Sequence, residues 1–207
     1  MKKERLIAAA ILTATWADGN SGGEDAAGGW AAGDGNTFLE DIEHGIKTIQ
    51  SNSGVTPNKL VIDLATFLNL NREATVRELF KYTSTEKHIS TTLLAQLLQL
   101  DEILIGKAIY STAKETKAGT QFTSHKIWEK NAGKGMGFLF YAPPSPGLKT
   151  PSAGYQVRTP YEGGQFREVA TYYEPQKRQD VYEVSEETDI VATGLDLGYL
   201  WKDTLLT

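Results

Sequence analysis

The sequence predicts an α+β protein, because helix patterns fill its first half and strand patterns fill its last third. Apolar residues recur at helical spacing early in the chain. β-Branched and aromatic residues dominate short segments after residue 153. Runs of helices followed by runs of strands are typical of the α+β class, and we expect a mixed or antiparallel sheet.

Length and composition are those of a soluble globular protein with one domain or two small ones. The chain has 207 residues, of which 40% are hydrophobic and 23% are charged. It contains no cysteine, which excludes disulfides, thiol nucleophiles and cysteine-ligated zinc. The net charge of −5 argues against nonspecific attraction to nucleic acid or to an anionic membrane. The apolar run Leu6–Leu12 is short for a signal peptide, so we expect the cut end of a longer amphipathic helix.

The best-defined unit runs from Asn36 to Leu70 and is expected to form a helix, a buried strand and a second helix. Thr37 and Glu40 match a capping box at the start of the first helix. The apolar face of this helix consists of residues at helical spacing, namely Phe38, Ile42, Ile46 and Ile49. Gly45 lies inside the helix and indicates a close backbone contact.

Turn signals on both sides of Leu60–Ile62 predict a short buried strand, and Asp63 is expected to cap the helix that follows. Further helices are expected over residues 1–14 and 73–82, and Ser90 or Thr91 is expected to cap another helix. Further strands are expected over residues 103–106 (continued by 108–110 past a bulge at Gly106), 127–128, 138–141, 154–159, 165–173, 179–184, 189–192 and 197–201. Loops are expected over residues 17–35, 82–88 and 111–124.

Motifs for catalysis or ligand binding are incomplete in this sequence. The glycine-rich segment Gly133–Gly137 lacks the Ser or Thr of a phosphate loop and opens no helix, so we expect a hairpin turn. The oxygen-rich segment Asp18–Asp25 lacks the ligand spacing of a calcium loop. The three histidines show no metal-ligand spacing (His44, His88 and His125). We therefore expect no enzyme activity, no cofactor and no metal site.

An acidic cluster lies near the end of the chain and consists of Glu183, Glu186, Glu187 and Asp189. Such a cluster is usually a solvated loop. The alternative interpretation is a set of salt-bridge partners for a neighbouring subunit.

Several stretches, in order along the chain, resemble tailed-phage major capsid proteins with the HK97-type fold. They are Leu39-Glu-Asp-Ile followed by Gly54-x-x-Pro57-Asn58-x-Leu60-Val61-Ile62, Arg77-Glu-Leu-Phe-Lys81-Tyr82, Ile89-x-x-x-Leu93-Leu94-Ala95, Leu104-Ile105-Gly106-x-Ala108-x-Tyr110, Ile127-Trp128 and Pro151-Ser152-Ala153-Gly154-Tyr155. Each motif alone is weak, and the ordered set is what carries the resemblance.

The resemblance implies an HK97-like fold with an axial (A) domain and a peripheral (P) domain. Residues 36–150 would form the axial domain, whereas residues 1–35 and 151–207 would be a remnant of the peripheral domain. In that remnant, residues 1–14 would be a stump of the family's long spine helix, and the remaining part would be the β-rich tail. The family's N-terminal arm and extended loop have no counterpart in this sequence, so we expect a fold truncated at its N-terminus.

The resemblance also implies a function, which is that of a structural subunit of a phage or prophage icosahedral capsid. Such subunits assemble with copies of themselves into pentamers and hexamers. Scaffold, portal and decoration proteins would be further partners, packaged DNA would be only a nonspecific contact, and no membrane is implied. The chain would belong in the virion, after a period in the host cytoplasm before assembly.

Candidate subunit-interface residues lie in polar loops, because exposed excursions on a wedge-shaped subunit tend to meet neighbours. They are Trp30, Tyr82, Lys87, His88, Lys114 and Lys117. The loop that contains Trp30 is either a flexible connection or a surface that docks on an adjacent subunit.

Two other functions remain as alternatives at this stage. One is the shell of an encapsulin-like nanocompartment with a cargo protein. The other is a carbohydrate-binding or hydrolase domain that uses an aromatic surface made of Trp128, Phe138, Phe140 and Tyr141.

Overall fold

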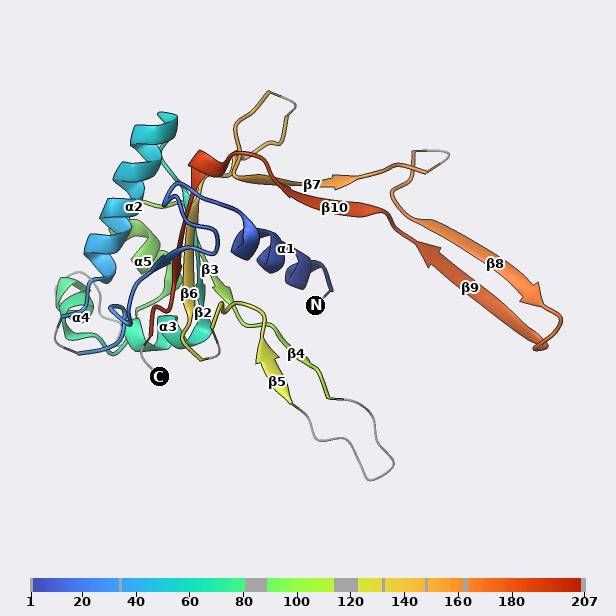
Figure 1. Cartoon of the computed structure of the whole chain (residues 1–207), viewed down its shortest axis with the longest axis horizontal. Coiled ribbons are helices and arrows are strands. Elements are labelled where there is room, and N and C mark those ends of the chain that lie inside the picture. Colours follow the sequence, from blue (N-terminus) through green and yellow to red (C-terminus); the bar gives the residue numbers. More distant parts are fainter. Residues whose placement is uncertain are drawn as a thin grey trace.

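A mixed five-stranded sheet forms the centre of the structure, in the order β1-β11-β6-β2-β3 (Figure 1). The computed structural model describes residues 2–33, 35–80, 89–113, 123–131, 133–147, 149–161 and 164–205. The sheet consists of β1 (Glu24–Asp25), β2 (Lys59–Asp63), β3 (Glu102–Gly106), β6 (Met136–Phe140) and β11 (Gly198–Lys202). β1 is parallel to β11 and β2 is parallel to β3, whereas β6 is antiparallel to both of its neighbours. The predicted α+β class with a mixed sheet is therefore confirmed.

Helices lie on both faces of this sheet (Figure 1). One core receives side chains from α2 (Phe38–Ser53), α3 (Leu64–Leu70), α4 (Ala74–Phe80) and α5 (Thr91–Leu97). α1 (Lys2–Thr13) lies on the opposite side and contributes Ala8 to a second core. In the part of the chain that the structure describes, every helix is too short or too polar to cross a lipid bilayer.

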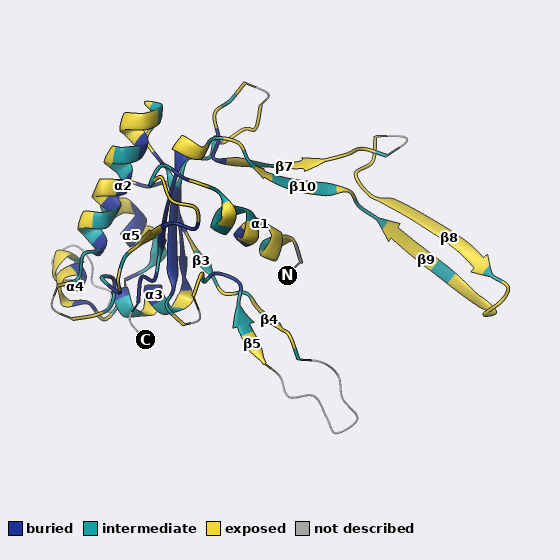
Figure 2. Cartoon of the chain, viewed as in Figure 1, coloured by how far each residue is buried: buried dark blue, intermediate teal, exposed yellow. Residues whose placement is uncertain are grey.

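Both faces of the sheet are buried, because successive side chains of the central strands enter different cores. Leu139 of β6 and Trp201 of β11 lie in the core on the α2 side. Phe138 and Leu200, their neighbours in sequence, lie in the core on the α1 side. This alternation follows from the two-residue period of a strand. It makes the central strands the most completely buried part of the molecule (Figure 2).

Two of the three predicted helix caps are confirmed. Asp63 accepts hydrogen bonds from the backbone N–H groups of the first turn of α3, and the Ser90 hydroxyl accepts one from Leu93 at the start of α5. The capping box at Thr37 is wrong, because the Thr37 side chain makes no capping hydrogen bond. Its hydroxyl donates instead to Oδ2 of Asp41, at 2.8 Å.

Three antiparallel strand pairs lie outside the central sheet. They are β4 (Ile109–Ser111) with β5 (Ser124–Lys126), β7 (Gly154–Arg158) with β10 (Thr188–Ala192), and β8 (Glu168–Glu174) with β9 (Gln179–Ser185). The last two pairs are nested, since β8 and β9 lie between β7 and β10 in sequence. The short 3₁₀ helix η1 (Leu195–Leu197) returns the chain to β11.

Two predicted strands around Gly106 need correction. The segment from residue 103 to residue 110 is not one bulged strand: β3 belongs to the central sheet and β4 to a separate hairpin. Gly106 is required for a different reason, because the indole of Trp128 occupies the space that a side chain would need. The strand predicted at residues 127–128 instead ends at Lys126, and Ile127 and Trp128 are buried.

The central sheet draws strands from both sides of the domain boundaries expected from the sequence. β2, β3 and β6 fall inside residues 36–150, whereas β1 and β11 fall outside that range. Hydrogen bonding between β11 and β6 therefore joins the two expected regions in one sheet.

Gly45 marks the place where α2 approaches the sheet most closely. A Cβ atom at this position would lie 2.6 Å from Cη2 of Trp201 and 3.3 Å from Cδ2 of Leu139. Trp201 is buried and fixed in β11, so its ring has little room to move. The close backbone contact predicted from the sequence is confirmed.

We expect Gly45→Ala to lower the free energy of unfolding by about 1–3 kcal/mol, because the new methyl group must displace a packed indole. In an unobstructed helix the same change would instead add about 0.5–1 kcal/mol of stability. Urea unfolding followed by circular dichroism measures the difference. Ser51→Ala, at an exposed site in the same helix, is the control and should change stability by less than about 0.5 kcal/mol. Unchanged or greater stability of Gly45→Ala would contradict the close packing.

Candidate functional site

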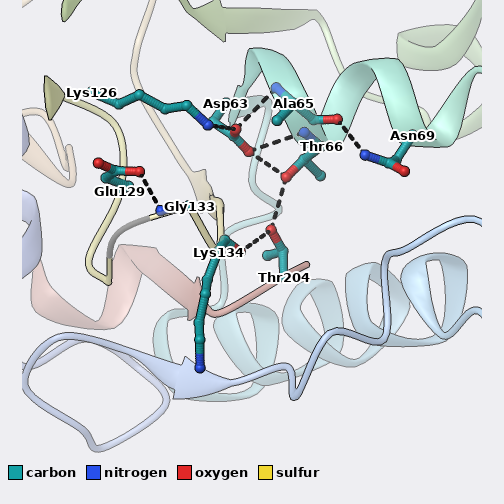
Figure 3. Close-up of polar contacts among 9 residues, drawn as sticks. All are labelled: Asp63, Ala65, Thr66, Asn69, Lys126, Glu129, Gly133, Lys134 and Thr204. Atoms are coloured by element: carbon teal, nitrogen blue, oxygen red, sulfur yellow. Dashed lines mark hydrogen bonds and ion pairs between the residues drawn. The ribbon is translucent and has the colours of Figure 1, made fainter. Parts of the chain in front are cut away.

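A buried polar cluster lies where β2 ends and α3 begins (Figure 3). The Asp63 carboxylate accepts hydrogen bonds from the backbone N–H of Ala65, at 3.0 Å, and of Thr66, at 3.2 Å. The Thr66 hydroxyl also hydrogen-bonds to Asp63, and lies 2.8 Å from the hydroxyl of Thr204. Nζ of Lys126 lies 3.8 Å from Oδ2 of Asp63. The cluster thus ties the helix α3 to residues near the end of the chain.

The glycine-rich turn before β6 closes over this cluster. A Cβ atom on Gly135 would lie 2.6–2.7 Å from the side-chain oxygens of Asp63, Thr66 and Thr204. Gly135 also has a φ of 68°, which favours glycine. The segment is a turn as predicted, but it is not a hairpin, because β5 pairs with β4 and β6 pairs with β2 and β11.

This geometry indicates a structural role for the cluster. Asp63, Thr66 and Thr204 are each almost fully buried. Among the described residues, every buried side-chain nitrogen or oxygen has a hydrogen-bond partner. Because the oxygens of the Asp63 carboxylate all accept hydrogen bonds from the chain itself, this carboxylate stabilises the local backbone and leaves no room for a substrate.

The oxygen-rich loop before residue 26 is also held by its own hydrogen bonds. The Asp18 carboxylate accepts from the backbone N–H groups of Asn20 and Glu24, both at 2.9 Å. Burial raises the pKa of Asp18 above its ordinary value, against the lowering effect of these hydrogen bonds. Within the ranges that the structure describes, no group of three or more His, Asp or Glu side chains is placed to hold a metal ion.

The predicted interface residues fall into two groups. The Trp30 side chain is fully buried in this chain, where it stands edge-on to Phe38 and lies against Trp201. Its Nε1 donates to Oδ2 of Asp41 at 2.7 Å. A side chain without exposed surface cannot touch a neighbouring subunit in this conformation, so the structure gives Trp30 a core role instead. The other predicted residues, Tyr82, Lys87, His88, Lys114 and Lys117, lie outside the described residues.

An open apolar groove lies between α1 and the sheet, and we call it the α1 groove. It encloses about 420 Å³ and runs from the sheet to the roots of β7 and β10. Its main apolar lining is Ile7, Ile11, Leu104, Phe138, Phe140 and Val191. The carboxylate of Glu4 also lines it, and accepts a hydrogen bond from Nε1 of Trp128 at 2.7 Å. The groove therefore suits an apolar partner.

The aromatic surface expected for carbohydrate binding is largely covered, and Tyr141, like Phe140, is only partly accessible. Trp128 and Phe138 are buried in the core on the α1 side. Phe140 stacks on Phe138, with ring centroids 5.1 Å apart, and is only partly accessible. Flat ring faces that are covered by the chain itself offer no stacking platform for a sugar, so this alternative loses its main support.

Glu186 forms an ion-pair cluster at the joint between β9 and β10. Its carboxylate accepts a hydrogen bond from Nζ of Lys3 in α1 and another from Nη2 of Arg167, at 3.2 Å. Nε of Arg158, at the end of β7, lies 4.0 Å from the same carboxylate. Lys3, as the largest contributor, and Arg167 lower the pKa of Glu186 from 4.5 to about 2.

The acidic cluster predicted near the end of the chain is therefore only partly a solvated loop. Glu183, Glu187 and Asp189 are exposed, as expected from the sequence. Glu186 instead pairs within its own chain and joins four segments that are distant in sequence. No spacing rule links Glu186 to Lys3, so sequence reasoning could not find this pairing.

Comparison with known proteins finds similarity to phage proteins. No family model matches the sequence. The chain is 30% identical over 166 residues to the major capsid protein of Burkholderia phage BcepMu, which covers 77% of this chain and 48% of that protein. A solved structure of a phage-related protein from Bordetella bronchiseptica RB50 is similar with a TM-score of 0.66 and 24% identity, covering 82% of this chain and 52% of that one. The chain thus spans about half the length of each protein.

We expect Asp63→Ala to lower the free energy of unfolding by about 1–3 kcal/mol, because α3 loses its cap and the buried Thr66 hydroxyl loses its acceptor. Urea unfolding gives the value. Asp180→Ala, at an exposed site in β9, is the matched control and should cost less than about 0.5 kcal/mol. Equal losses in the two variants would contradict the structural role of the cluster.

We expect the Glu186 cluster to weaken in acid, because the pKa of Glu186 is lower in the folded chain than in the unfolded chain. The contribution of the cluster to the free energy of unfolding is fully present above pH 4.5 and is lost as the pH falls toward about 2. Thermal unfolding across this range should show a smaller pH dependence for Glu186→Gln than for the unmodified chain. Glu187→Gln, an exposed neighbour, should keep the original pH dependence. The same pH dependence in all three proteins would rule out the proposed role of Glu186.

Proposed function

We propose, from similarities that support a phage capsid-like family, that this chain is a structural subunit of a phage capsid shell. The observation that carries the proposal is the 30% identity to the major capsid protein of phage BcepMu over 77% of this chain. The similar fold of the phage-related protein from Bordetella bronchiseptica supports it independently of sequence. The match covers about half of each relative. That this chain shares the role of the whole relative is therefore proposed.

The surface of the chain is suited to assembly. Two strand pairs, β7–β10 and β8–β9, extend from the body, and β4–β5 extends from another part of it (Figure 1). A shell protein works through repeated contacts along its edges, and weak contacts become strong when many act together. Contacts between different patches on successive copies generate closed rings when the rotation closes. Pentamers and hexamers in an icosahedral shell would be such rings.

We keep the HK97-like domain assignment as part of the proposal, and we add two strands of the central sheet to its axial domain. The axial domain would contain residues 36–150 together with β1 and β11, which pair into the same sheet. The peripheral remnant would contain α1 and the nested strands β7–β10 and β8–β9.

The partners and location follow from the same proposal. The principal partners would be other copies of this chain, and the protein would act as a non-enzymatic component of the virion after a period in the host cytoplasm. Scaffold, portal or decoration proteins would be secondary partners, and packaged DNA would be only a nonspecific contact. Tyr82, Lys87, His88, Lys114 and Lys117 remain the proposed interface residues from the sequence.

We expect the full-length gene product to form shells, rings or capsomer-sized oligomers when it is expressed and purified. Negative-stain electron microscopy and size-exclusion chromatography with light scattering would detect them. The 207-residue chain, tested in parallel, shows whether its own surfaces are sufficient. A full-length protein that stays strictly monomeric over a wide concentration range would overturn the proposal.

A further inference from the structure

The β8–β9 ribbon, defined as residues 168–185, has one apolar face and one acidic face. Its register pairs Val169 with Val184 and Thr171 with Tyr182, and places Tyr173 on the same face, which is apolar except for Asp180 opposite Tyr173. The opposite face carries three carboxylates, from Glu168, Glu174 and Glu183. Such a division between two faces is typical of a sheet that is covered on one side only.

The apolar face of the ribbon is uncovered in the single chain. Tyr182 is 73% exposed and Val169 is 62% exposed, and Tyr173 and Val184 are similarly accessible. In the described part of the chain, β8 and β9 pack chiefly on each other, and the ribbon extends away from the body (Figures 1 and 2). A two-stranded hairpin is at best marginally stable in water on its own. The apolar face therefore needs a partner.

The α1 groove is a second apolar surface that the chain leaves open. Ile7 of α1, Leu104 of β3 and Val191 of β10 line the groove and are each more than a third exposed. Its Glu4 carboxylate is already engaged by Trp128. The groove therefore presents apolar surface of the kind that the ribbon face requires.

The ribbon and the groove of one chain are held apart. The root of the ribbon is fixed to α1 and β7 by the Glu186 cluster, through Lys3, Arg167 and Arg158. From that root, the ribbon runs away from α1 (Figure 1). Because both surfaces exist on every copy but cannot meet within one copy, they can cover each other between copies.

We propose that the apolar face of the β8–β9 ribbon packs into the α1 groove of a second copy of this chain. This inference rests on the proposed function and names one contact through which the subunits would assemble. The contact joins two different patches, so it continues from copy to copy and forms a ring where the rotation between copies closes. The acidic face of the ribbon then points to solvent, so its carboxylates stay hydrated and are not buried against an apolar surface.

Disulfide trapping tests this contact cleanly, because the 207-residue chain contains no cysteine. One variant carries Tyr182→Cys on the ribbon face, and another carries Leu104→Cys in the groove. Mixing the two under mild oxidation should give a disulfide-linked heterodimer, whereas each variant alone should remain mostly uncrosslinked. A mixture of Leu104→Cys with Glu183→Cys, which lies on the acidic face, is the matched control and should give several-fold less heterodimer.

Three results would overturn the inference. They are equal crosslinking on the two faces of the ribbon, preferential homodimers of Tyr182→Cys, and no heterodimer above the Glu183→Cys control. If the full-length product nevertheless forms shells, only this contact is wrong; if it also stays monomeric, the proposed function fails as well. Matching circular dichroism spectra and melting curves would show that the variants are folded.

A second measurement uses no crosslink. Tyr182→Ser should weaken the self-association of the full-length product, whereas Tyr172→Ser, which removes an exposed tyrosine from the opposite face, should leave it nearly unchanged. Sedimentation velocity over a concentration series measures the self-association of both variants. Equal effects of the two substitutions would contradict docking through the apolar face.

Discussion

The antiparallel pairing of β6 with β11 is the constraint on which the rest of the structure depends. These strands are neighbours in the sheet although a long stretch of chain separates them. Everything between them must leave the body and return to the same place. The nested pairs β7–β10 and β8–β9 are therefore one extended excursion whose two ends are fixed by a buried ladder of hydrogen bonds.

Packing around this ladder explains several features that are distant in sequence. Trp201 of β11 contacts Trp30 in the early loop and leaves no room for a side chain at Gly45. Thr204, just after β11, joins the polar cluster at Asp63 and closes the end of the sheet. These contacts all lie within the body, while the Glu186 cluster links the excursion to α1.

Local elements were predictable from the sequence, because their signals lie within one or two turns of chain. α2, β2 and the caps at Asp63 and Ser90 follow from spacing and side-chain chemistry, and the β-branched and aromatic content of residues 165–173 predicts the strand β8. The errors arose where a distant partner decides the outcome. Asp41 takes the hydroxyl of Thr37, Trp201 buries Trp30, and Lys3 engages Glu186. The pairing of β1 and β11 into the same sheet as β2 likewise depends on partners that are distant in sequence.

The position of β11 also determines when the protein can finish folding. β1 and β6 both pair with this strand, and both precede it in the chain. Contacts of such wide sequence separation form slowly and late. The nascent chain therefore cannot close its sheet before β11 has been synthesised, and until then its apolar surfaces depend on chaperones or on rapid completion for protection from premature association.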